Sequence, residues 1–268
     1  MYSKISILGG GILEKEIIKF NLSGMSACIR KPDSNTTYFT YNNPHKMTIM
    51  GILGAIIGEN GYNYNAFKNI DELPECYINL KHLKIAVEPL AVYGNFSKKI
   101  QTFNNSVGYA SKEVGGNLVV EEQWLENPSW NIYILSDDTK VYEKIKDYLV
   151  NSKCEYIPYL GKNDHFATIS DVEILQGKLT TEKNIKISSL VDKNCVDVIE
   201  RDVEDLLFEY NPTGANDEEF EYIEVSPTEL DKKIGYINYK PFAFTNKELV
   251  VKESEKVYSI EGKNIFFY

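Results

Sequence analysis

The chain has 268 residues, of which 43% are hydrophobic and 12% aromatic, enough for a large folded core in one or two domains. Its four cysteines are scattered without a CxxC pair and no apolar run reaches the length of a membrane span, so a disulfide framework, a zinc site and a membrane protein are not expected. The net charge of −10 disfavours nucleic acid at first sight, and the N-terminus carries no signal-peptide pattern, so we expect a cytoplasmic protein.

The negative charge is concentrated in one segment. Thirteen acidic residues and one arginine lie between Asp197 and Asp231, giving this segment −12 and leaving +2 for the rest of the chain. A nearly neutral body is compatible with a local phosphate-binding groove. The acidic segment itself is interpreted as a solvated surface stretch, with a docking face for a basic partner as the alternative.

The first glycine group, Ile7–Leu13, resembles the start of a dinucleotide-binding turn. Glu14 stands where the third glycine of that motif belongs, and the next segment has the pattern of a strand, so a Rossmann site is disfavoured. The alternation over Lys15–Leu22 predicts a strand, and Ser26–Arg30 extends it or pairs with it.

An apolar run then predicts a helix from Ile49 to about Gly58, with Thr48 as its N-cap. Gly51, Gly54 and Gly58 leave one face of this helix almost without side chains. Since a glycine inside a helix costs about 1 kcal/mol relative to alanine, we expect a close approach there, either by a sheet or by the backbone of a ligand. Free amides at the helix N-terminus suit a phosphate group.

Further elements follow in chain order. Strands are predicted at Leu83–Leu90, Asn131–Leu135 and Phe166–Leu175, and a helix at Lys140–Val150 capped by Asp137 or Asp138. The polar stretch Tyr93–Leu118 lacks strong periodicity, which is typical of a projecting hairpin or functional loop. The resulting order β-α-β-β-α-β is that of the ferredoxin-like arrangement. We therefore predict an α+β protein with a ferredoxin-like (RRM-like) domain over residues 1–175, and an acidic segment with β-rich C-terminal strands over 176–268.

Motifs for common enzyme classes are missing from the sequence. It has no P-loop ending, no GxSxG and no HExxH, and its three histidines are too few for a histidine cage, so no catalytic group, cofactor or metal is expected. Arg30 and Lys31 end a predicted strand near Lys46 at the start of the glycine helix. Solvated surface charge and phosphate binding are about equally compatible with these three cations.

Three segments together resemble a known family. They are Ala27–Pro32 (ACIRKP), Tyr38–Gly58 with its GILGAIIG helix, and Tyr156–Ala167 (YIPYLGKNDHFA), supported by Asn127–Leu135. They are similar to family five of the CRISPR-associated proteins, the RAMP subunit that caps the 5′ end of the guide RNA in type I Cascade complexes of antiviral defence. The PYLGKN segment is most like the type I-B branch. The resemblance spans about Glu16 to Leu175.

The resemblance implies a non-catalytic RNA-binding subunit that holds the 5′ handle of the crRNA. It also implies a projecting β-hairpin thumb at about 94–118, a Cascade backbone subunit and a large subunit as partners, and target DNA only through the complex. The implied RNA-binding residues are Arg30, Lys31, Tyr41, Lys46, Lys98, Lys99, Asn104, Lys112, Gly161, Lys162 and Asn163. Single-stranded RNA held in this way is read by shape, stacking and base edges, with Tyr38, Tyr41 and Tyr109 as stacking candidates.

The alternative is a metal-independent endoribonuclease that processes repeat RNA, as type I-C relatives of the family do. That chemistry needs a group with a near-neutral pKa beside the ribose 2′-hydroxyl. Its candidates here are Tyr41, His45, Lys46 and His165, but no close Lys-His pair lies in the predicted thumb.

Overall fold

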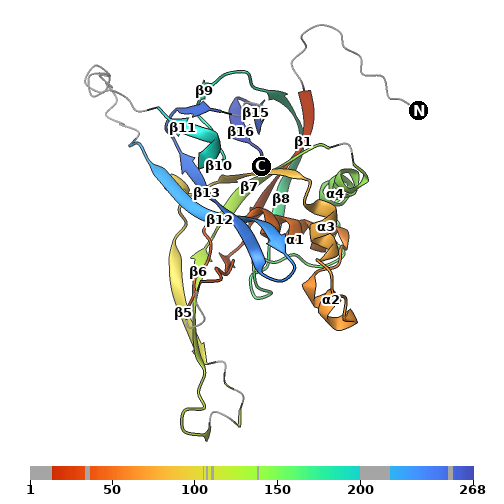
Figure 1. The fold of residues 1–268 in the computed structure, drawn as a ribbon, viewed down its shortest axis with the longest axis vertical. Helices are drawn as coiled ribbons and strands as arrows, with labels where there is room; N and C mark the ends of the chain where they lie inside the picture. Colours follow the sequence, from red (N-terminus) through yellow and green to blue (C-terminus); the bar gives the residue numbers. More distant parts are fainter. Residues whose placement is uncertain are drawn as a thin grey trace.

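A computed structural model of the chain describes residues 14–33, 37–104, 106, 108–109, 112–137, 139–199, 218–252 and 256–268 (Figure 1). The glycine group at 7–13, Asp138 and most of the acidic segment lie outside the described residues. Within the described part, no helix is long and apolar enough to cross a membrane. The protein is a mixed α and β structure in which antiparallel sheets predominate.

A six-stranded antiparallel sheet forms the centre of the molecule, in the strand order β16-β15-β8-β1-β7-β4. Four of its strands and two helices follow one another as strand, helix, strand, strand, helix, strand. These elements are β1 (Glu14–Ser23), α1 (Lys46–Ile57), β4 (Lys84–Pro89), β7 (Ser129–Leu135), α4 (Lys140–Val150) and β8 (Thr168–Leu179). The predicted strands and helices of this part are thus present, with ends shifted by a few residues.

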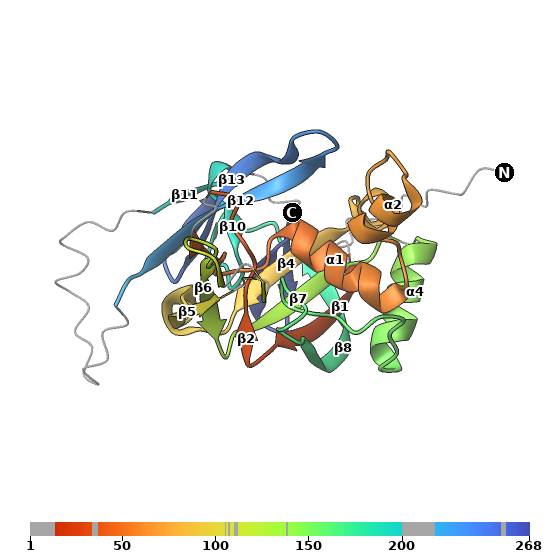
Figure 2. The same ribbon diagram turned by 90° about the horizontal axis from the view of Figure 1, so that it is seen from below.

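The alternation of β1 explains how the sheet acquires two buried faces. Ile18, Phe20 and Leu22 point into the main core, where α1 and α4 lie side by side over the sheet (Figure 2). Ile17 points to the opposite face. Successive side chains of a strand project to opposite sides, so burial of both sets requires a cover on each face.

The cover of the second face comes from the C-terminal end of the described chain. Strands β15 (Val257–Ile260) and β16 (Lys263–Phe266) pair beside β8 and bring Tyr258 and Phe267 over Ile17 and Tyr133. Beyond β16, Tyr268 exchanges two backbone hydrogen bonds with Ile85 of β4, so the sheet curls until its first and last strands meet. Strand β8 also runs through the boundary predicted at 175/176, and the C-terminal strands join the N-terminal sheet.

Helix α1 begins three residues before the predicted start. Its N-cap is His45, whose imidazole accepts a hydrogen bond from the Thr48 amide, so the prediction of Thr48 as N-cap is wrong. The close approach predicted for the glycine face occurs at Gly54, where a Cβ would lie 2.6 Å from the Cβ of Cys76. Cys76 belongs to the short helix α3 (Glu75–Leu80), which means that a helix fills the place where a sheet or ligand was expected. Gly51 faces open space.

Helix α4 has the predicted bounds but a different cap. Thr139 accepts the amide of Tyr142, whereas Asp137 accepts hydrogen bonds from Thr139 itself, so the assignment of Asp137 or Asp138 as the cap is wrong. A further short helix, α2 (Tyr62–Lys68), lies between α1 and α3.

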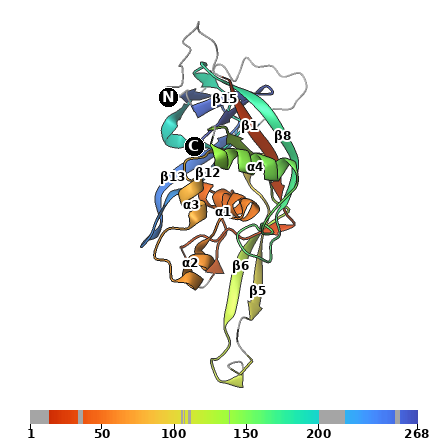
Figure 3. The same ribbon diagram turned by 90° about the vertical axis from the view of Figure 1, so that its right-hand side faces the viewer.

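A long hairpin projects from the body, as expected, but it runs from Lys98 to Glu126, so its second strand lies beyond the predicted range Tyr93–Leu118 (Figures 1 and 3). It consists of β5 (Lys98–Asn104) and β6 (Val119–Glu126), which pair antiparallel from Lys98 opposite Leu125 to Asn104 opposite Val119. At the base, β6 also pairs with the short strands β2 (Ser26–Ala27) and β3 (Thr37–Tyr38). The hairpin is therefore attached to the body through the segment that follows β1.

The described part of the acidic segment is a strand and not only a solvated stretch. Its residues 221–231 form β12 (Glu221–Asp231), which pairs along its length with β13 (Gly235–Thr245). The remaining short strands complete two three-stranded sheets: β9 (Asn184–Ile185), β10 (Val191–Asp192), β11 (Val196–Val198) and β14 (Leu249–Val251). Short 3-10 turns lie at Val92–Gly94 and Lys193–Cys195.

Candidate nucleic-acid interface

A cleft of about 800 Å³ lies where the hairpin joins the body. Three separate parts of the chain form it: one face of the β5–β6 hairpin, the residues Cys28, Arg30 and Tyr38 that follow β1, and the loop at 161–164. Its lining residues are Cys28, Arg30, Tyr38, Gln101, Phe103, Val120, Glu122, Trp124, Gly161, Lys162 and Asp164. We refer to this region as the hairpin cleft.

Strand pairing sets the hairpin side of the cleft. Gln101 stands opposite Glu122, and Phe103 stands opposite Val120. Since side chains alternate along each strand, these four and Trp124 share one face of the hairpin. The half-buried rings of Phe103 and Trp124 thus offer apolar surface within the cleft.

The second wall carries Arg30 and Tyr38. Arg30 forms an isolated bridge with Thr40, which folds this segment back on itself, and its guanidinium lies 3.7 Å from the centre of the Tyr38 ring. A guanidinium stacked on an aromatic ring is one surface on which a nucleobase packs. Arg30 is exposed and lines the cleft.

The loop wall depends on Gly161. Its φ of +89° lies in the left-handed region, and a Cβ there would come 1.9 Å from the carbonyl oxygen of Cys28. The amide of Cys28 donates to the carbonyl of Leu160, so loop and segment are in direct backbone contact. The unusual backbone expected at this glycine is confirmed, and only glycine fits.

Lys162 crosses the cleft from the loop to the hairpin. Its Nζ lies 2.7 and 2.8 Å from the two carboxylate oxygens of Glu122, whose side chain is 3% exposed. Burial lowers the pKa of Lys162, but the hydrogen bond and charge of Glu122 outweigh it and raise the pKa overall. The ammonium is also 5.5 Å from the centre of the Phe103 ring, so a fixed positive charge stands over apolar surface.

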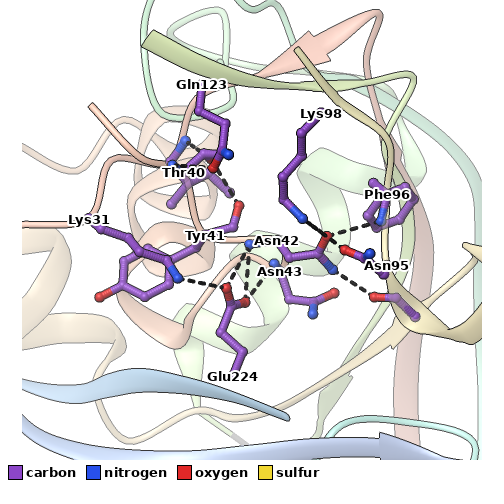
Figure 4. Close-up of polar contacts among 12 residues, drawn as sticks. Lys31, Thr40, Tyr41, Asn42, Asn43, Asn95, Phe96, Lys98, Gln123 and Glu224 are labelled. Atoms are coloured by element: carbon purple, nitrogen blue, oxygen red, sulfur yellow. Dashed lines mark hydrogen bonds and ion pairs between the residues drawn. The ribbon is translucent and has the colours of Figure 1, made fainter. Parts of the chain in front are cut away.

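Lys31 and Tyr41 lie in a neighbouring cluster around Glu224 of β12 (Figure 4). The Glu224 carboxylate accepts the backbone amides of Asn42 and Asn43 at 2.9 to 3.1 Å, and Oε1 is 3.3 Å from the Lys31 Nζ. Tyr41 is buried, with the Lys31 ammonium 5.1 Å from its ring centre. Two amides and an ammonium make a typical anion site, and here a carboxylate of the chain itself fills it.

Lys98 contacts the same turn from the hairpin. Its Nζ donates to the side-chain oxygens of Asn42 at 3.2 Å and Asn95 at 2.8 Å, and the Asn42 side chain also bonds Gly94 and Phe96 (Figure 4). Burial is the main cause that lowers the pKa of Lys98. This lysine therefore helps to hold the hairpin base in place.

Lys46 lies away from the cleft and points into the protein. Its Nζ is 3.3 Å from the backbone oxygen of Tyr268, and burial, together with the charge of Lys84, lowers its pKa to about 8. The N-terminus of α1 beside it is enclosed by His45, whose ring packs edge-on against Tyr41 and Tyr236. The amides expected to suit a phosphate are thus covered by side chains.

The other predicted site residues are exposed. Lys99 on β5 lies 5.6 Å from the ring centre of Trp124 and 3.7 Å from Glu126, while Asn104 accepts the amide of Ser106. Lys112 lies beyond β5 toward the end of the hairpin, and Asn163 lies in the cleft loop next to Lys162.

The structure thus gathers the predicted residues Arg30, Gly161 and Lys162 in the hairpin cleft, with Lys99 at its edge. It places Lys31, Tyr41 and Lys98 in the Glu224 cluster and Lys46 in the interior. Sequence reasoning missed four contributors: Phe103, Glu122, Trp124 and Glu224. Glu122 and Trp124 stand two residues apart in Val119–Glu126 and so share one face of a strand, which was a readable signal for these two, but no local pattern connects Glu224 to Lys31.

No protein-family model and no curated protein matches the chain. Several solved structures are similar. A structure described as a CRISPR RNA-guided surveillance complex aligns at 13% identity over 86% of this chain and 90% of the other, with a TM-score of 0.47. The Type III-B Cmr-beta bound to cognate target RNA and AMPPnP aligns at 11% identity over 89% and 86%, with a TM-score of 0.46. A structure described as a Cas protein aligns at 14% identity over 89% and 96%, with a TM-score of 0.39.

Proposed function

We propose that this protein is a non-catalytic RNA-binding subunit of a CRISPR effector complex, of type I-B, that holds the 5′ handle of the crRNA in the hairpin cleft. The sequence resemblance in three segments supports the family. The strand order β8-β1-β7-β4, with α1 and α4 on one face, is the order of a ferredoxin-like domain. The projecting hairpin corresponds to the thumb that the resemblance implies.

The observation that carries the proposal is the composition of the cleft. Arg30 lies far in the sequence from the adjacent pair Gly161 and Lys162, yet all three were expected to contact RNA and line one cavity together with three aromatic side chains. Cations that track a backbone, beside rings on which bases stack, are the elements with which proteins bind single-stranded RNA. Lys99 continues this surface along the hairpin, with Asn104 and Lys112 further out.

The geometry narrows the set of proposed contacts. We assign phosphate contacts to Arg30, Lys99 and Lys162, and stacking to Tyr38, Phe103 and Trp124. Tyr41 is buried and Lys46 is half-buried with its ammonium against the backbone of Tyr268, so both support the fold beneath the interface. The backbone and large subunits of the complex are the proposed protein partners.

The nuclease alternative finds little support in the described residues. His45 is 3% exposed and caps α1, and burial lowers its pKa to about 3, so it is neutral and remote from the cleft. His165 is 2% exposed and lies behind the cleft wall. A general base needs hydrogen-bond reach to the proton that it removes, and neither imidazole presents a nitrogen to the cleft surface.

The test is binding of fluorescently labelled repeat RNA to the purified protein in EDTA, followed by anisotropy and by gel analysis of the RNA. Arg30→Ala and Lys162→Ala should each weaken binding by about tenfold, whereas the surface variant Lys183→Ala should not. Unchanged affinity in both cleft variants would show that the cleft is not the RNA site. Site-specific cleavage that His165→Gln abolishes would replace the non-catalytic role with the nuclease.

A further inference from the structure

Three potential metal ligands converge behind the wall of the hairpin cleft. The Sγ of Cys28, a carboxylate oxygen of Glu122 and a ring nitrogen of His165 all lie within 4.8 Å of one another. They come from three segments: the stretch after β2, strand β6 and the loop that follows Lys162. Their residues are 1%, 2% and 2% exposed, respectively.

His165 supplies an independent indication. Its Nε2 is buried and has no hydrogen-bond partner, although a buried polar atom without a partner is costly. The ring is held in place because Nδ1 lies 2.6 Å from the Ser26 hydroxyl and Trp124 packs edge-on at 4.6 Å between ring centres. In the tautomer that carries its proton on Nδ1, this N–H donates to Ser26 and leaves Nε2 with a lone pair for a metal, as in zinc-bound histidines.

We propose that Cys28, Glu122 and His165 form a Zn²⁺ site that ties the hairpin to the body. One thiolate, one imidazole and one carboxylate are the ligand types that zinc takes in proteins. Around tetrahedral zinc, with bonds of about 2.0–2.3 Å, ligand atoms lie about 3.3–3.7 Å apart, so the cluster needs to contract by no more than about 1.5 Å on binding. As the Zn–S bond forms, the Cys28 thiol releases its proton to solvent.

In the metal-free protein, the ammonium of Lys162 supplies the positive charge that zinc would bring to the Glu122 carboxylate. It neutralises Glu122, and the indole N–H of Trp124 donates to the same carboxylate at 2.9 Å. When zinc takes one carboxylate oxygen, Lys162 and Trp124 remain as outer partners that orient the ligand. Cys28 and Glu122 also line the cleft, so the site adjoins it. The site shares Lys162 and Trp124 with the proposed RNA surface, but metal binding can be tested without RNA.

Titration of the reduced protein with Co²⁺, a spectroscopic substitute for Zn²⁺, tests the site. We expect one equivalent to produce a thiolate-to-metal charge-transfer band that Zn²⁺ then displaces. Cys28→Ser should abolish the band, and His165→Gln should weaken binding by about 100-fold or more. Cys195→Ser removes another buried cysteine and should leave the titration unchanged. Absence of the band from wild-type protein, or its persistence in Cys28→Ser, would overturn the proposal.

Circular dichroism of each variant separates lost ligation from lost folding. Crystals of the wild-type protein grown with Zn²⁺ provide a test that needs no variant, because anomalous scattering at the zinc edge locates the metal. A peak among the three ligand atoms supports the site. No peak, or a peak elsewhere, refutes it.

Discussion

The ammonium of Lys31 lies 3.3 Å from the carboxylate of Glu224, a residue of the acidic segment that also accepts the amides of Asn42 and Asn43. A segment that sequence composition assigned to the solvent thus neutralises one of the predicted RNA-binding cations. The pair is half-enclosed: the Lys31 side chain is 29% exposed and that of Glu224 is 5% exposed. Strand β12 therefore limits the positive potential beside the cleft.

Glu224→Gln should raise RNA affinity while lowering stability. The substitution keeps the shape of the side chain, frees the charge of Lys31 and removes a negative charge near the cleft, so we expect about three- to tenfold tighter binding of repeat RNA. Weaker hydrogen bonds to the two amides should cost about 1–3 kcal/mol of unfolding free energy. Anisotropy and urea denaturation measure the two effects. Glu229→Gln makes the same charge change at an exposed position of β12 and should alter neither; an equal gain in both variants would point to net charge alone.

Gly161→Ala should be strongly destabilising. The substitution combines a positive φ with a Cβ only 1.9 Å from a backbone oxygen, and backbone cannot yield as a side chain does. We expect a loss of about 3 kcal/mol or more in urea denaturation. Gly235→Ala is the matched control, since Gly235 has a φ of +86° in open space and should lose only about 1 kcal/mol. Equal losses would mean that the loop moves away from Cys28 at little cost.

The salt dependence of RNA binding should separate the contribution of base stacking in the cleft from that of charge. Phe103→Ala removes a ring and should weaken RNA binding by about 1–3 kcal/mol, with the slope of log K against log salt unchanged. Lys162→Ala should reduce that slope by about 1, because one phosphate contact is lost. Ile100→Ala, on β5 with a half-exposed side chain facing away from the cleft, is the control. A changed slope in Phe103→Ala would argue against stacking.

Acid should destabilise the protein through His45. Burial lowers the pKa of this imidazole to about 3, below the ordinary value near 6.5, so the unfolded chain takes up the proton first as the pH falls. Its contribution to stability is complete above about pH 6.5 and is lost progressively toward pH 3. Between pH 6.5 and 5 we expect a decrease of about 2 kcal/mol in unfolding free energy.

His45→Asn keeps a capping side chain without a titrating group and should flatten this part of the pH profile. His82→Asn alters an exposed imidazole and should retain the wild-type slope. Since burial also lowers the pKa of His165, the His45 contribution is the difference between the wild-type and variant curves. Parallel curves would contradict the assignment.

Much of the central sheet was predictable from periodicity. The alternation in Lys15–Leu22 and the apolar segments around Ile85 and Ile132 are local patterns that show which side chains will be buried, and all three segments form strands. The helix caps were not predictable in the same way: His45 acts as an N-cap because Tyr41 and Tyr236, distant in sequence, bury its ring. Likewise, Gly54 packs on Cys76 because α3 folds back, which no feature of the glycine pattern specifies.

For the candidate site, the sequence indicated which cations were candidates for RNA binding but not where each would lie in the folded protein. Arg30 could be singled out as a cation that ends a predicted strand, and Lys162 through the resemblance of Tyr156–Ala167 to a known family. Lys46 has the same local character but lies under the backbone of Tyr268, a contact across most of the chain. The partner of each lysine, whether Glu122, Glu224 or a carbonyl, depends on long-range strand placement, and that partner decides whether the charge is available to RNA.

The pairing of Ile85 with Tyr268 has a consequence for how the molecule is made. The face formed by Ile17, Ala86 and Tyr133 acquires its cover only when β15 and β16 have been synthesised, long after β1, β4 and β7 have left the ribosome. Closing so large a loop costs conformational entropy, so these contacts form late in folding. Folds dominated by such long-range contacts also form slowly. Until then the nascent sheet presents an apolar surface with an unpaired edge, the kind of intermediate that aggregates or engages chaperones. Fragments that end before Val257 should consequently be recovered mainly as insoluble protein.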